Sequence, residues 1–538
     1  MDTPLSQPVY QPDNPDDATR HYLIRLALSQ KGRLEDYPFI LRELAPPPDI
    51  TTIISPGTLK DRRVGIIGGG LAGMAAAFEL RKLGMDITIY DAEERIGGRV
   101  YTWYFDKEKR FYGEFGPMRM PVAHETLWHY INLFKLNTRP FIQNNSNGFI
   151  YLQNVRVRND PDGRNVMAYI YPKYELSPWE SQTPWQRLLY QAYEDPLLKA
   201  SPYVRSEILK VLPEYDPQTL FWDATSNRKM QEYQSISQGA IALLANFAPL
   251  AGQNLSNSYI DYVQELYSAD LSYLYEIPGG LVKLPLAFYH SFQSQNGIRE
   301  YGDLLPDELG TVRFFRGCRV EGITMGANGK VVLAYRHKKN PGIKTEAFDY
   351  VVCAIPFSTL RTIDIKPLFS NLKMQAIREV YYINSQKTLL LCKRRFWEEG
   401  GESEQIIGGA SITDLPISQI YYPSDHAAQS TRKWYNRYGM EPCCHAYFHD
   451  KKDDSLAKEP GVILASYNFG QTATRLANMT DEARFKEVTQ NIEMVHGLPP
   501  GYVESIAAGL KTVNWSDEPW FRGALCYYTP EQKRLFSY

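Results

Sequence analysis

The sequence predicts an α/β fold in which a discontinuous parallel-sheet domain is joined to a mixed β-sheet domain and a helical domain. The length of 538 residues indicates about two to four domains. Residues 62–91, RRVGIIGGGLAGMAAAFELRKLGMDITIYD, have the pattern of a strand, a glycine turn, a helix and a second strand. Residues 125–275 favour helices, and strand-like stretches such as VRFFRGCRVEGI, KVVLAYRHK and FDYVVCAIP follow after about residue 310.

These patterns divide the chain into segments. An N-terminal extension ends in the Pro-rich stretch APPPDITTIISPG, which is typical of a linker. The predicted segments are 1–60 for the extension, 61–110 and 276–370 for the nucleotide-binding domain, 111–165 and 371–538 for the mixed-sheet domain, and 166–275 for the helical domain.

Composition excludes several classes of partner. The 59 basic and 61 acidic residues give a net charge of −2, so nothing favours nucleic acid or an anionic membrane surface. The longest apolar runs, near 66–78 and 239–252, are too short to span a bilayer. The acidic, Pro-rich N-terminus lacks the basic n-region and the apolar core of a signal peptide. We therefore expect a protein that is cytoplasmic, or secreted after a leader has been removed.

The six cysteines are scattered and form no CxxC pair, so reduced thiols are expected. The stretch CCHAYFHD places Cys443, Cys444, His445 and His449 close together, and these residue types can bind metals. Adjacent cysteines do not match the common zinc spacing. We therefore predict no metal site, and a variable loop at this position.

The first strand, helix and second strand make a βαβ unit. An apolar strand at 64–67 precedes an Ala/Leu-rich helix at 71–83, for which Gly84 is a plausible C-cap. The second strand ends at Asp91. Such a unit builds a parallel sheet of the Rossmann-like type.

Gly68, Gly70 and Gly73 stand in the spacing G-x-G-x-x-G between that strand and that helix. Gly68 allows a tight turn, Gly70 lets a pyrophosphate approach the backbone, and Gly73 allows close helix–strand packing. The phosphates would lie at the helix N-terminus, where free N–H groups favour anions. Asp91, 23 residues after Gly68, is placed to bind a ribose 2′-hydroxyl, which disfavours NADP. The alternative is a glycine turn without a ligand.

Two features favour FAD over NAD. A second mononucleotide-binding half does not follow directly, and the second strand continues into Asp91-Ala-Glu-Glu-Arg-Ile-Gly-Gly-Arg99. An acid followed by Arg-x-Gly-Gly-Arg resembles the flavin amine oxidase family, and the resemblance covers nearly all of residues 60–538. It implies that Arg99 reaches the flavin phosphates, where a guanidinium can form two parallel hydrogen bonds.

The stretch GEFGPMRMP places Arg119 among apolar residues, where a guanidinium requires an anion. Gly116-Pro117-Met118-Arg119-x-Pro121 resembles the L-amino-acid oxidase branch of the family. The resemblance implies that Gly116 and Met118 run under the flavin ring and that Arg119 binds the substrate α-carboxylate. The alternative is an internal ion pair between Arg119 and an Asp or Glu.

Lys387 begins the apolar run KTLLLC, where a lysine is costly unless it is solvated or paired. The resemblance implies that this lysine holds a water near flavin N5. A strand-end lysine that reaches solvent is the alternative. Tyr467 matches a tyrosine that gives the carboxylate a second hydrogen bond, although the neighbouring Ser466 leaves the register open.

The resemblance extends to three further positions. Trp515, in VNWSDEPWFRGA, matches a tryptophan that lines the flavin, and Ala524 matches the wall beside the substrate side chain. Val320, in CRVEGI, matches a position whose backbone pairs with adenine, although a core valine would look the same.

The activity that the resemblance implies is FAD-dependent oxidation of an L-amino acid by O2. Hydride transfer from Cα to flavin N5 would lead to a 2-oxo acid, ammonia and hydrogen peroxide. The alternatives are a related amine oxidase, an amino-acid 2-monooxygenase, or a truncated flavin-fold chain without turnover. We expect a homodimer or a higher assembly.

The family continues beyond the RGALCYYTP-like region with a segment that completes the flavin site, whereas this sequence stops at Tyr538. We therefore expect a second chain to supply that segment.

Overall fold

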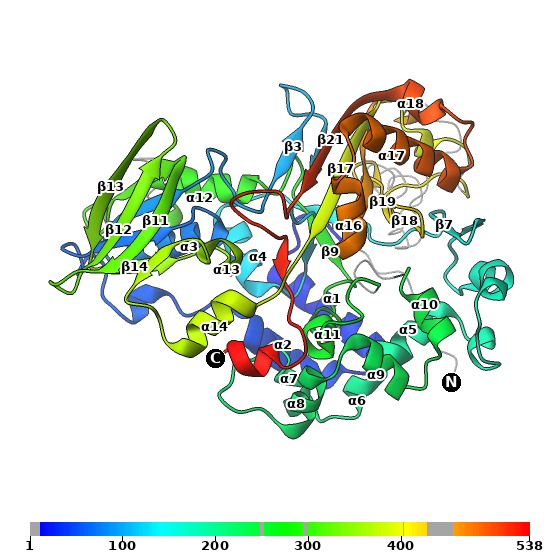
Figure 1. Ribbon diagram of the computed structural model, residues 1–538, viewed down its shortest axis with the longest axis horizontal. Coiled ribbons are helices and arrows are strands. Elements are labelled where there is room, and N and C mark those ends of the chain that lie inside the picture. The colour runs from blue at the N-terminus through cyan, green and yellow to red at the C-terminus, as the bar shows by residue number, and fades with distance from the viewer. Residues whose placement is uncertain (1–10, 248–251, 294–298, 402, 428–455) are drawn as a thin grey trace.

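The computed structural model describes residues 11–247, 252–293, 299–401, 403–427 and 456–538, and Figure 1 shows their arrangement. The candidate ligands between 443 and 449 lie outside these residues. Within them, none of the helices combines the length and the apolar composition that crossing a membrane requires.

A parallel sheet forms the nucleotide-binding part of the fold. Its strand order is β10-β2-β1-β14, and every neighbouring pair is parallel. The strands are β1 (Arg63–Ile67), β2 (Asp86–Asp91), β10 (Val312–Arg316) and β14 (Tyr350–Cys353). Helix α3 (Leu71–Arg81) follows β1 directly. Because β10 and β14 come from more than two hundred residues later in the chain, the sheet is discontinuous in sequence, as predicted.

A second sheet packs against this one, at the left of Figure 1. Its order is β13-β12-β11-β15, with strands β11 (Cys318–Met325), β12 (Val331–His337), β13 (Asn340–Phe348) and β15 (Asp364–Lys366). A Cβ atom added to Gly65 of β1 would lie only 2.8 Å from the Phe348 ring and 3.0 Å from Leu333. The absence of a side chain at Gly65 therefore lets the two sheets pack closely.

The mixed sheet lies at the upper right of Figure 1 and has the order β21-β17-β20-β19-β18-β7-β8. Its strands are β7 (Phe149–Leu152), β8 (Val155–Arg158), β17 (Ser385–Cys392), β18 (Ala410–Thr413), β19 (Gln419–Tyr421), β20 (Gly461–Phe469) and β21 (Ala507–Asn514). Smaller sheets join β5 (Met120–Pro121), β9 (Leu274–Glu276) and β6 (Arg139–Phe141), β3 (Thr102–Tyr104) and β4 (Tyr112–Glu114), and β16 (Tyr382–Ile383) and β22 (Leu525–Cys526).

Many helices gather in the lower part of the view in Figure 1, whereas α16, α17 and α18 lie beside the mixed sheet at the upper right. The helices of the first half are α1 (Asp17–Gln30), α2 (Tyr37–Leu44), α4 (Glu125–Leu133), α5 (Trp185–Tyr193), α6 (Asp195–Leu198), α7 (Pro202–Ser206), α8 (Pro217–Ala224), α9 (Asn227–Tyr233), α10 (Gln238–Leu244) and α11 (Tyr259–Tyr267). The later ones are α12 (Lys283–Gln293), α13 (Phe357–Leu360), α14 (Asn371–Glu379), α16 (Gly470–Ala477), α17 (Asp481–His496), α18 (Tyr502–Ile506) and α19 (Gln532–Phe536).

The N-terminal helices belong to this layer and are not a separate appendage. Leu23, Ile24 and Leu28 of α1 are buried in the main core. Buried Arg20 donates to the Val122 carbonyl, and buried Arg33 donates to the Leu266 carbonyl at the end of α11. Core packing and buried hydrogen bonds therefore attach residues 17–44 to the rest of the fold.

Candidate active site

The glycine turn between β1 and α3 has the geometry that its spacing predicts. Gly68 adopts a left-handed φ of +102°, and a Cβ atom there would lie 2.8 Å from the Ala354 carbonyl oxygen. A Cβ at Gly73 would lie 1.9 Å from the Gly68 carbonyl oxygen, so only glycine allows this helix to start so close to the strand. A Cβ at Gly70 would meet only the Gly98 Cα, at 4.0 Å. The backbone at Gly70 therefore faces open space at the helix N-terminus, where a phosphate can approach.

A cavity of about 280 Å³ opens above this turn. It lies between the parallel sheet, the second sheet and the segment that follows β21. Predicted residues on its wall are Gly68, Gly70, Asp91, Arg99 and Val320, and the wall also includes Gly97, Gly98, Pro117, Trp520 and Phe521. An elongated ligand with a diphosphate at its middle fits such a wall, because glycine backbone and a guanidinium meet there.

Asp91 and Arg99 lie at the mouth of the glycine turn. The Asp91 carboxylate accepts hydrogen bonds from the Gly69 and Glu93 backbone N–H groups, each at 2.8 Å, and burial raises its pKa. Arg99 donates to the Ala524 carbonyl at 2.9 Å and takes part in none of the ion pairs of the described chain. Burial lowers the pKa of Arg99. A half-buried guanidinium without an anion fits a diphosphate neighbour.

Lys387 lies inside the mixed sheet. In β17 it stands opposite Tyr467 of β20 and Val513 of β21, and it is only 2% exposed. Its Nζ donates to the Gly116 carbonyl at 2.6 Å and lies 4.4 Å from the centre of the Tyr467 ring. The alternative of a lysine that reaches solvent is therefore wrong.

Burial lowers the pKa of Lys387 to about 7, and the nearby Arg119 charge acts in the same direction. Glu114 opposes this shift. The pKa of Glu114 is itself raised by burial to about 7, although its carboxylate accepts hydrogen bonds from the Leu281 N–H at 2.7 Å and the Thr102 hydroxyl at 2.9 Å. The pKa values of both groups therefore lie near neutral pH.

Arg119 directly precedes β5 and is half-buried. Its guanidinium donates to the Gln143 side-chain oxygen at 3.0 Å and to the Tyr421 hydroxyl at 3.4 Å. No carboxylate of the described residues forms an ion pair with it, so the alternative of an internal ion pair is absent from this part of the chain. Both hydrogen-bond partners of Arg119 are therefore neutral side chains.

Tyr467 connects Arg119 with Lys387. Its ring packs edge-on against Tyr421 with centroids 6.1 Å apart. The adjacent Ser466 is buried, and its hydroxyl donates to the Gln386 side chain at 2.8 Å. Because successive residues of a strand point to opposite faces, Tyr467 rather than Ser466 shares a face with Lys387.

The remaining predicted residues border the same region. Trp515 is buried, and its indole N–H donates to the Phe115 carbonyl at 3.1 Å. Ala524 and Met118 pack at the edge of the same apolar cluster. Met118 lines a smaller cavity of about 110 Å³, not the cavity above the glycine turn.

Several residues of the site were not predicted from the sequence. Glu114 shifts the titration of Lys387, and Gln143 and Tyr421 hold the Arg119 guanidinium. Trp520 lines the large cavity. Glu114 stood within the GEFGPMRMP stretch and Trp520 close to Trp515, so proximity to known motifs was a usable signal for both. Gln143 and Tyr421 carry no such signal.

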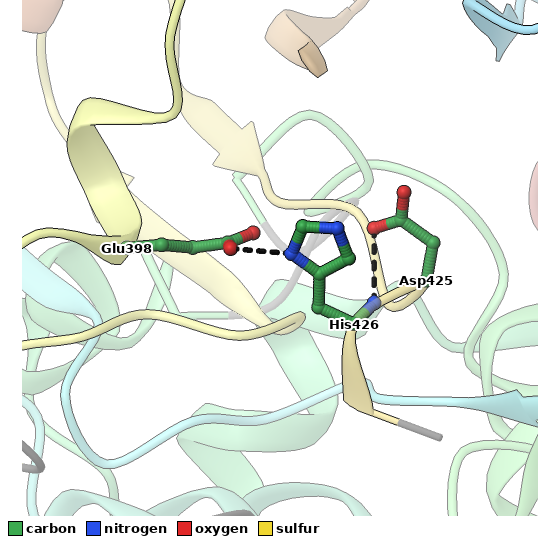
Figure 2. A group of neighbouring side chains, drawn as sticks. All are labelled: Glu398, Asp425 and His426. Atoms are coloured by element: carbon green, nitrogen blue, oxygen red, sulfur yellow. Dashed lines mark hydrogen bonds and ion pairs between the residues drawn. The ribbon is translucent and has the colours of Figure 1, made fainter. Parts of the chain in front are cut away.

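A cluster of metal-ligand types lies outside this centre. Figure 2 shows Glu398, Asp425 and His426, with the Glu398 carboxylate 2.6 Å from His426 Nδ1. Arg395 donates to Glu398 at 3.0 Å and to both Asp425 oxygens at 2.8 and 2.6 Å. Although burial acts to raise the pKa of Asp425, the Arg395 hydrogen bonds lower it to about 2. Arg395 thus neutralises the carboxylates that a cation would need.

Replacing Arg395 with methionine is expected to lower the free energy of unfolding by about 3 to 5 kcal/mol, because two carboxylates would lose their buried counter-charge. Urea unfolding measures the change, and Arg394→Met, which removes an ion pair with Glu399 at a half-buried position, is the control. EDTA is expected to leave the thermal midpoint of the wild-type chain unchanged. A midpoint that falls with EDTA, together with a stable Arg395→Met variant, would identify the cluster as a metal site instead.

Comparison with known proteins places this geometry in a family. Residues 71–536 match the family of flavin containing amine oxidoreductases. The L-amino-acid oxidase of Sistrurus catenatus edwardsii is 27% identical over 489 residues, covering 89% of this chain and 80% of that protein. An L-amino-acid oxidase of Bothrops moojeni is 27% identical over 486 residues, covering 89% and 82%.

Solved structures show the same fold. A mutant of putrescine oxidase with redesigned cofactor binding superimposes with a TM-score of 0.59 at 16% identity, covering 88% of this chain and 89% of that chain. Wild-type putrescine oxidase bound to putrescine gives a TM-score of 0.57 at 16% identity, covering 87% and 88%. At this identity the likeness concerns the fold alone.

The family match covers most of the chain, and the glycine turn between β1 and α3 has the form of a dinucleotide-binding site. This agreement confirms the predicted fold class and the predicted cofactor. The chain belongs to the flavin containing amine oxidoreductase family, and its cofactor is FAD.

Proposed function

We propose that this chain oxidises the α-amino group of an L-amino acid. The products would be a 2-oxo acid, ammonia and hydrogen peroxide, with O2 as the electron acceptor. The observation that carries the proposal is the guanidinium of Arg119, which has two neutral partners and lies beside Tyr467 and Lys387. A carboxylate on the substrate would form an ion pair with this guanidinium, whereas a plain amine would leave the guanidinium without an ion-pair partner.

Each residue of the centre would have a distinct task. Arg119 would bind the α-carboxylate through two parallel hydrogen bonds, and the Tyr467 hydroxyl would donate another. These contacts would hold the substrate Cα in a fixed orientation. FAD, when bound, would supply the two-electron oxidation, with O2 as the final electron acceptor.

Lys387 would act through its charge and its remaining N–H groups. With the Nζ held at the Gly116 carbonyl, the amine can position one water molecule and exchange a proton with it. A pKa of about 7 lets Lys387 take up and release that proton near neutral pH. In its charged form it would favour negative charge that develops when O2 is reduced.

The L-amino-acid oxidases among the relatives support this proposal, whereas putrescine oxidase shares only the fold. Incubation of the FAD-loaded protein with each of the twenty L-amino acids tests it. We expect peroxide and ammonia in equal amounts from at least one amino acid, and no activity with amines such as putrescine. Oxidation of amines alone would indicate an amine oxidase, and release of carbon dioxide with an amide would indicate a monooxygenase.

A further inference from the structure

Gln143 contacts Arg119 directly, although none of the tasks described above depends on it. Arg119 Nη1 donates to Gln143 Oε1 at 3.0 Å, and Gln143 Nε2 donates to the Tyr421 hydroxyl at 3.4 Å. The same hydroxyl accepts a hydrogen bond from Arg119 Nη1 at 3.4 Å, and Tyr421 is only 4% exposed. Because a guanidinium only donates, the amide atom that faces it must be the oxygen. The three side chains therefore form a closed triangle of hydrogen bonds.

A small sheet brings Arg119 and Gln143 together. Arg119 directly precedes β5 and Gln143 follows β6, and both strands pair with β9. Met120 of β5 and Pro140 of β6 lie opposite the same residue of β9, Tyr275. Backbone pairing therefore fixes the two chain segments from which the guanidinium and the amide extend.

The triangle occupies one nitrogen of the guanidinium. Nη1 carries two N–H groups, and it donates to two acceptors, Gln143 and Tyr421. None of the hydrogen bonds among the described residues involves Nε or Nη2 of Arg119. These two atoms carry parallel N–H groups on one edge of the planar group, and this pair matches the two oxygens of a carboxylate. The triangle thus leaves the Nε–Nη2 edge of Arg119 without a protein partner in the described chain.

The neutrality of Gln143 matters as much as its position. Glutamate has nearly the same shape as glutamine, and at this distance it would form an ion pair with Arg119. That ion pair would compensate the charge of Arg119 before a substrate binds, and the glutamate would also repel a substrate carboxylate. An amide instead holds the guanidinium in place without adding a negative charge.

We propose that Gln143 is a positioning residue that orients Arg119 and, because it is neutral, makes the site selective for substrates with a carboxylate. This inference rests on the proposed function, because it takes Arg119 as the residue that binds the α-carboxylate. It goes further by naming the residue that keeps both the charge and the Nε–Nη2 edge of Arg119 available to the substrate.

A kinetic comparison of Gln143→Glu with Gln143→Leu separates this role from packing. For every amino acid that is oxidised, kcat/KM should fall about 30-fold to 1,000-fold in Gln143→Glu, mainly through a higher KM. In Gln143→Leu it should fall only about threefold to 30-fold, because Arg119 loses one acceptor but keeps its charge. Gln490→Glu, at an exposed position of α17, is the matched control and should leave kcat/KM unchanged. The reverse order, with the near-isosteric glutamate better tolerated than leucine, would show a packing role and overturn the proposal.

A double-mutant cycle tests whether Gln143 acts through Arg119, and it does not require Gln143→Glu to fold. In the Arg119→Ala background, Gln143→Leu should change kcat/KM by less than about twofold, because the group that it positions is absent. An equal loss from Gln143→Leu in the wild-type and Arg119→Ala backgrounds would show that Gln143 acts independently of Arg119.

A binding test separates this inference from the proposed reaction. We would titrate the FAD-loaded protein with hexanoate and with hexanamide, its neutral counterpart, by calorimetry. The wild type should bind hexanoate at least about tenfold more tightly, and Gln143→Glu should abolish this preference. If no amino acid is oxidised but the preference exists and is lost in Gln143→Glu, the proposed function fails and the role of Gln143 stands. A preference that persists unchanged in Gln143→Glu, or equal binding of the two ligands by the wild type, would overturn the role of Gln143.

Discussion

Replacing Arg119 with alanine is expected to lower kcat/KM about a hundredfold to ten-thousandfold for every amino acid that the enzyme oxidises. Each hydrogen bond between charged groups contributes about 1.5 to 3 kcal/mol, and the guanidinium can make two of them to one carboxylate. The loss should be similar for all side chains because the α-carboxylate is common to them. Steady-state peroxide production over the substrate series measures it.

Two further variants make the Arg119 experiment decisive. Arg119→Lys keeps the charge but not the planar pair of donors, so its kcat/KM should lie between those of the wild type and Arg119→Ala. Arg164→Ala removes a guanidinium whose side chain is 82% exposed, and it should leave kcat/KM unchanged. If Arg119→Ala stays within about threefold of the wild type, the carboxylate lies elsewhere and the proposed function loses its main support.

Lys387→Met is expected to stabilise the folded chain and at the same time to slow its reaction with O2. The pKa of Lys387 is lowered from 10.5 in the unfolded chain to about 7 in the folded one. Below pH 7 both states hold the proton, and the folded chain bears the full cost of a buried ammonium. Between pH 7 and 10.5 only the unfolded state holds it, so stability rises with pH by up to about 1.4 kcal/mol per unit. Methionine removes that cost.

We therefore expect Lys387→Met to raise the free energy of unfolding by about 2 to 4 kcal/mol at pH 6, after allowing for the lost hydrogen bond to Gly116. The gain should vanish as the pH approaches 10.5. Urea unfolding at pH 6 and at pH 10 measures both values. A variant that is less stable than the wild type at pH 6 would contradict the lowered pKa of Lys387.

The same substitution is expected to slow the reaction with O2 by about tenfold to a thousandfold, because it removes the buried positive charge. Anaerobic reduction by substrate and reoxidation by O2 can be followed separately in flavin absorbance, and the first should change less. Lys511→Met, on the neighbouring strand β21 at an exposed position, is the control. An unchanged rate of reoxidation would show that the Lys387 charge does not assist O2 reduction.

Local motifs were sufficient to predict the cofactor and the fold class. The spacing of Gly68, Gly70 and Gly73 is a steric requirement of the turn between β1 and α3. A Cβ atom at Gly73 would lie only 1.9 Å from the Gly68 carbonyl oxygen. Because these glycines are close together in the chain, the requirement can be recognised as a sequence motif. The roles of the individual site residues, the domain boundaries, the assembly state and the second chain stay predictions.

Contacts between distant segments determine the burial of Lys387 and the partners of Arg119, which no sequence motif contains. The sequence could not show that Lys387 is enclosed, because its burial depends on Tyr467 and Val513 in strands that lie 80 and 126 positions later in the chain. Likewise, the partners of Arg119 are Gln143 and Tyr421, 24 and 302 positions away.

The sequence by itself was enough to predict the dinucleotide-binding glycine turn, the family, and Arg119 as the candidate carboxylate-binding residue. Each of these depends on residues that are close together in the chain. Only the tertiary structure decided which charges stay uncompensated. The hydrogen-bond partners of Arg119 are the neutral side chains of Gln143 and Tyr421, which come from distant segments of the chain. Charge compensation depends on distance and burial in space, and these arise only when segments far apart in the chain pack together.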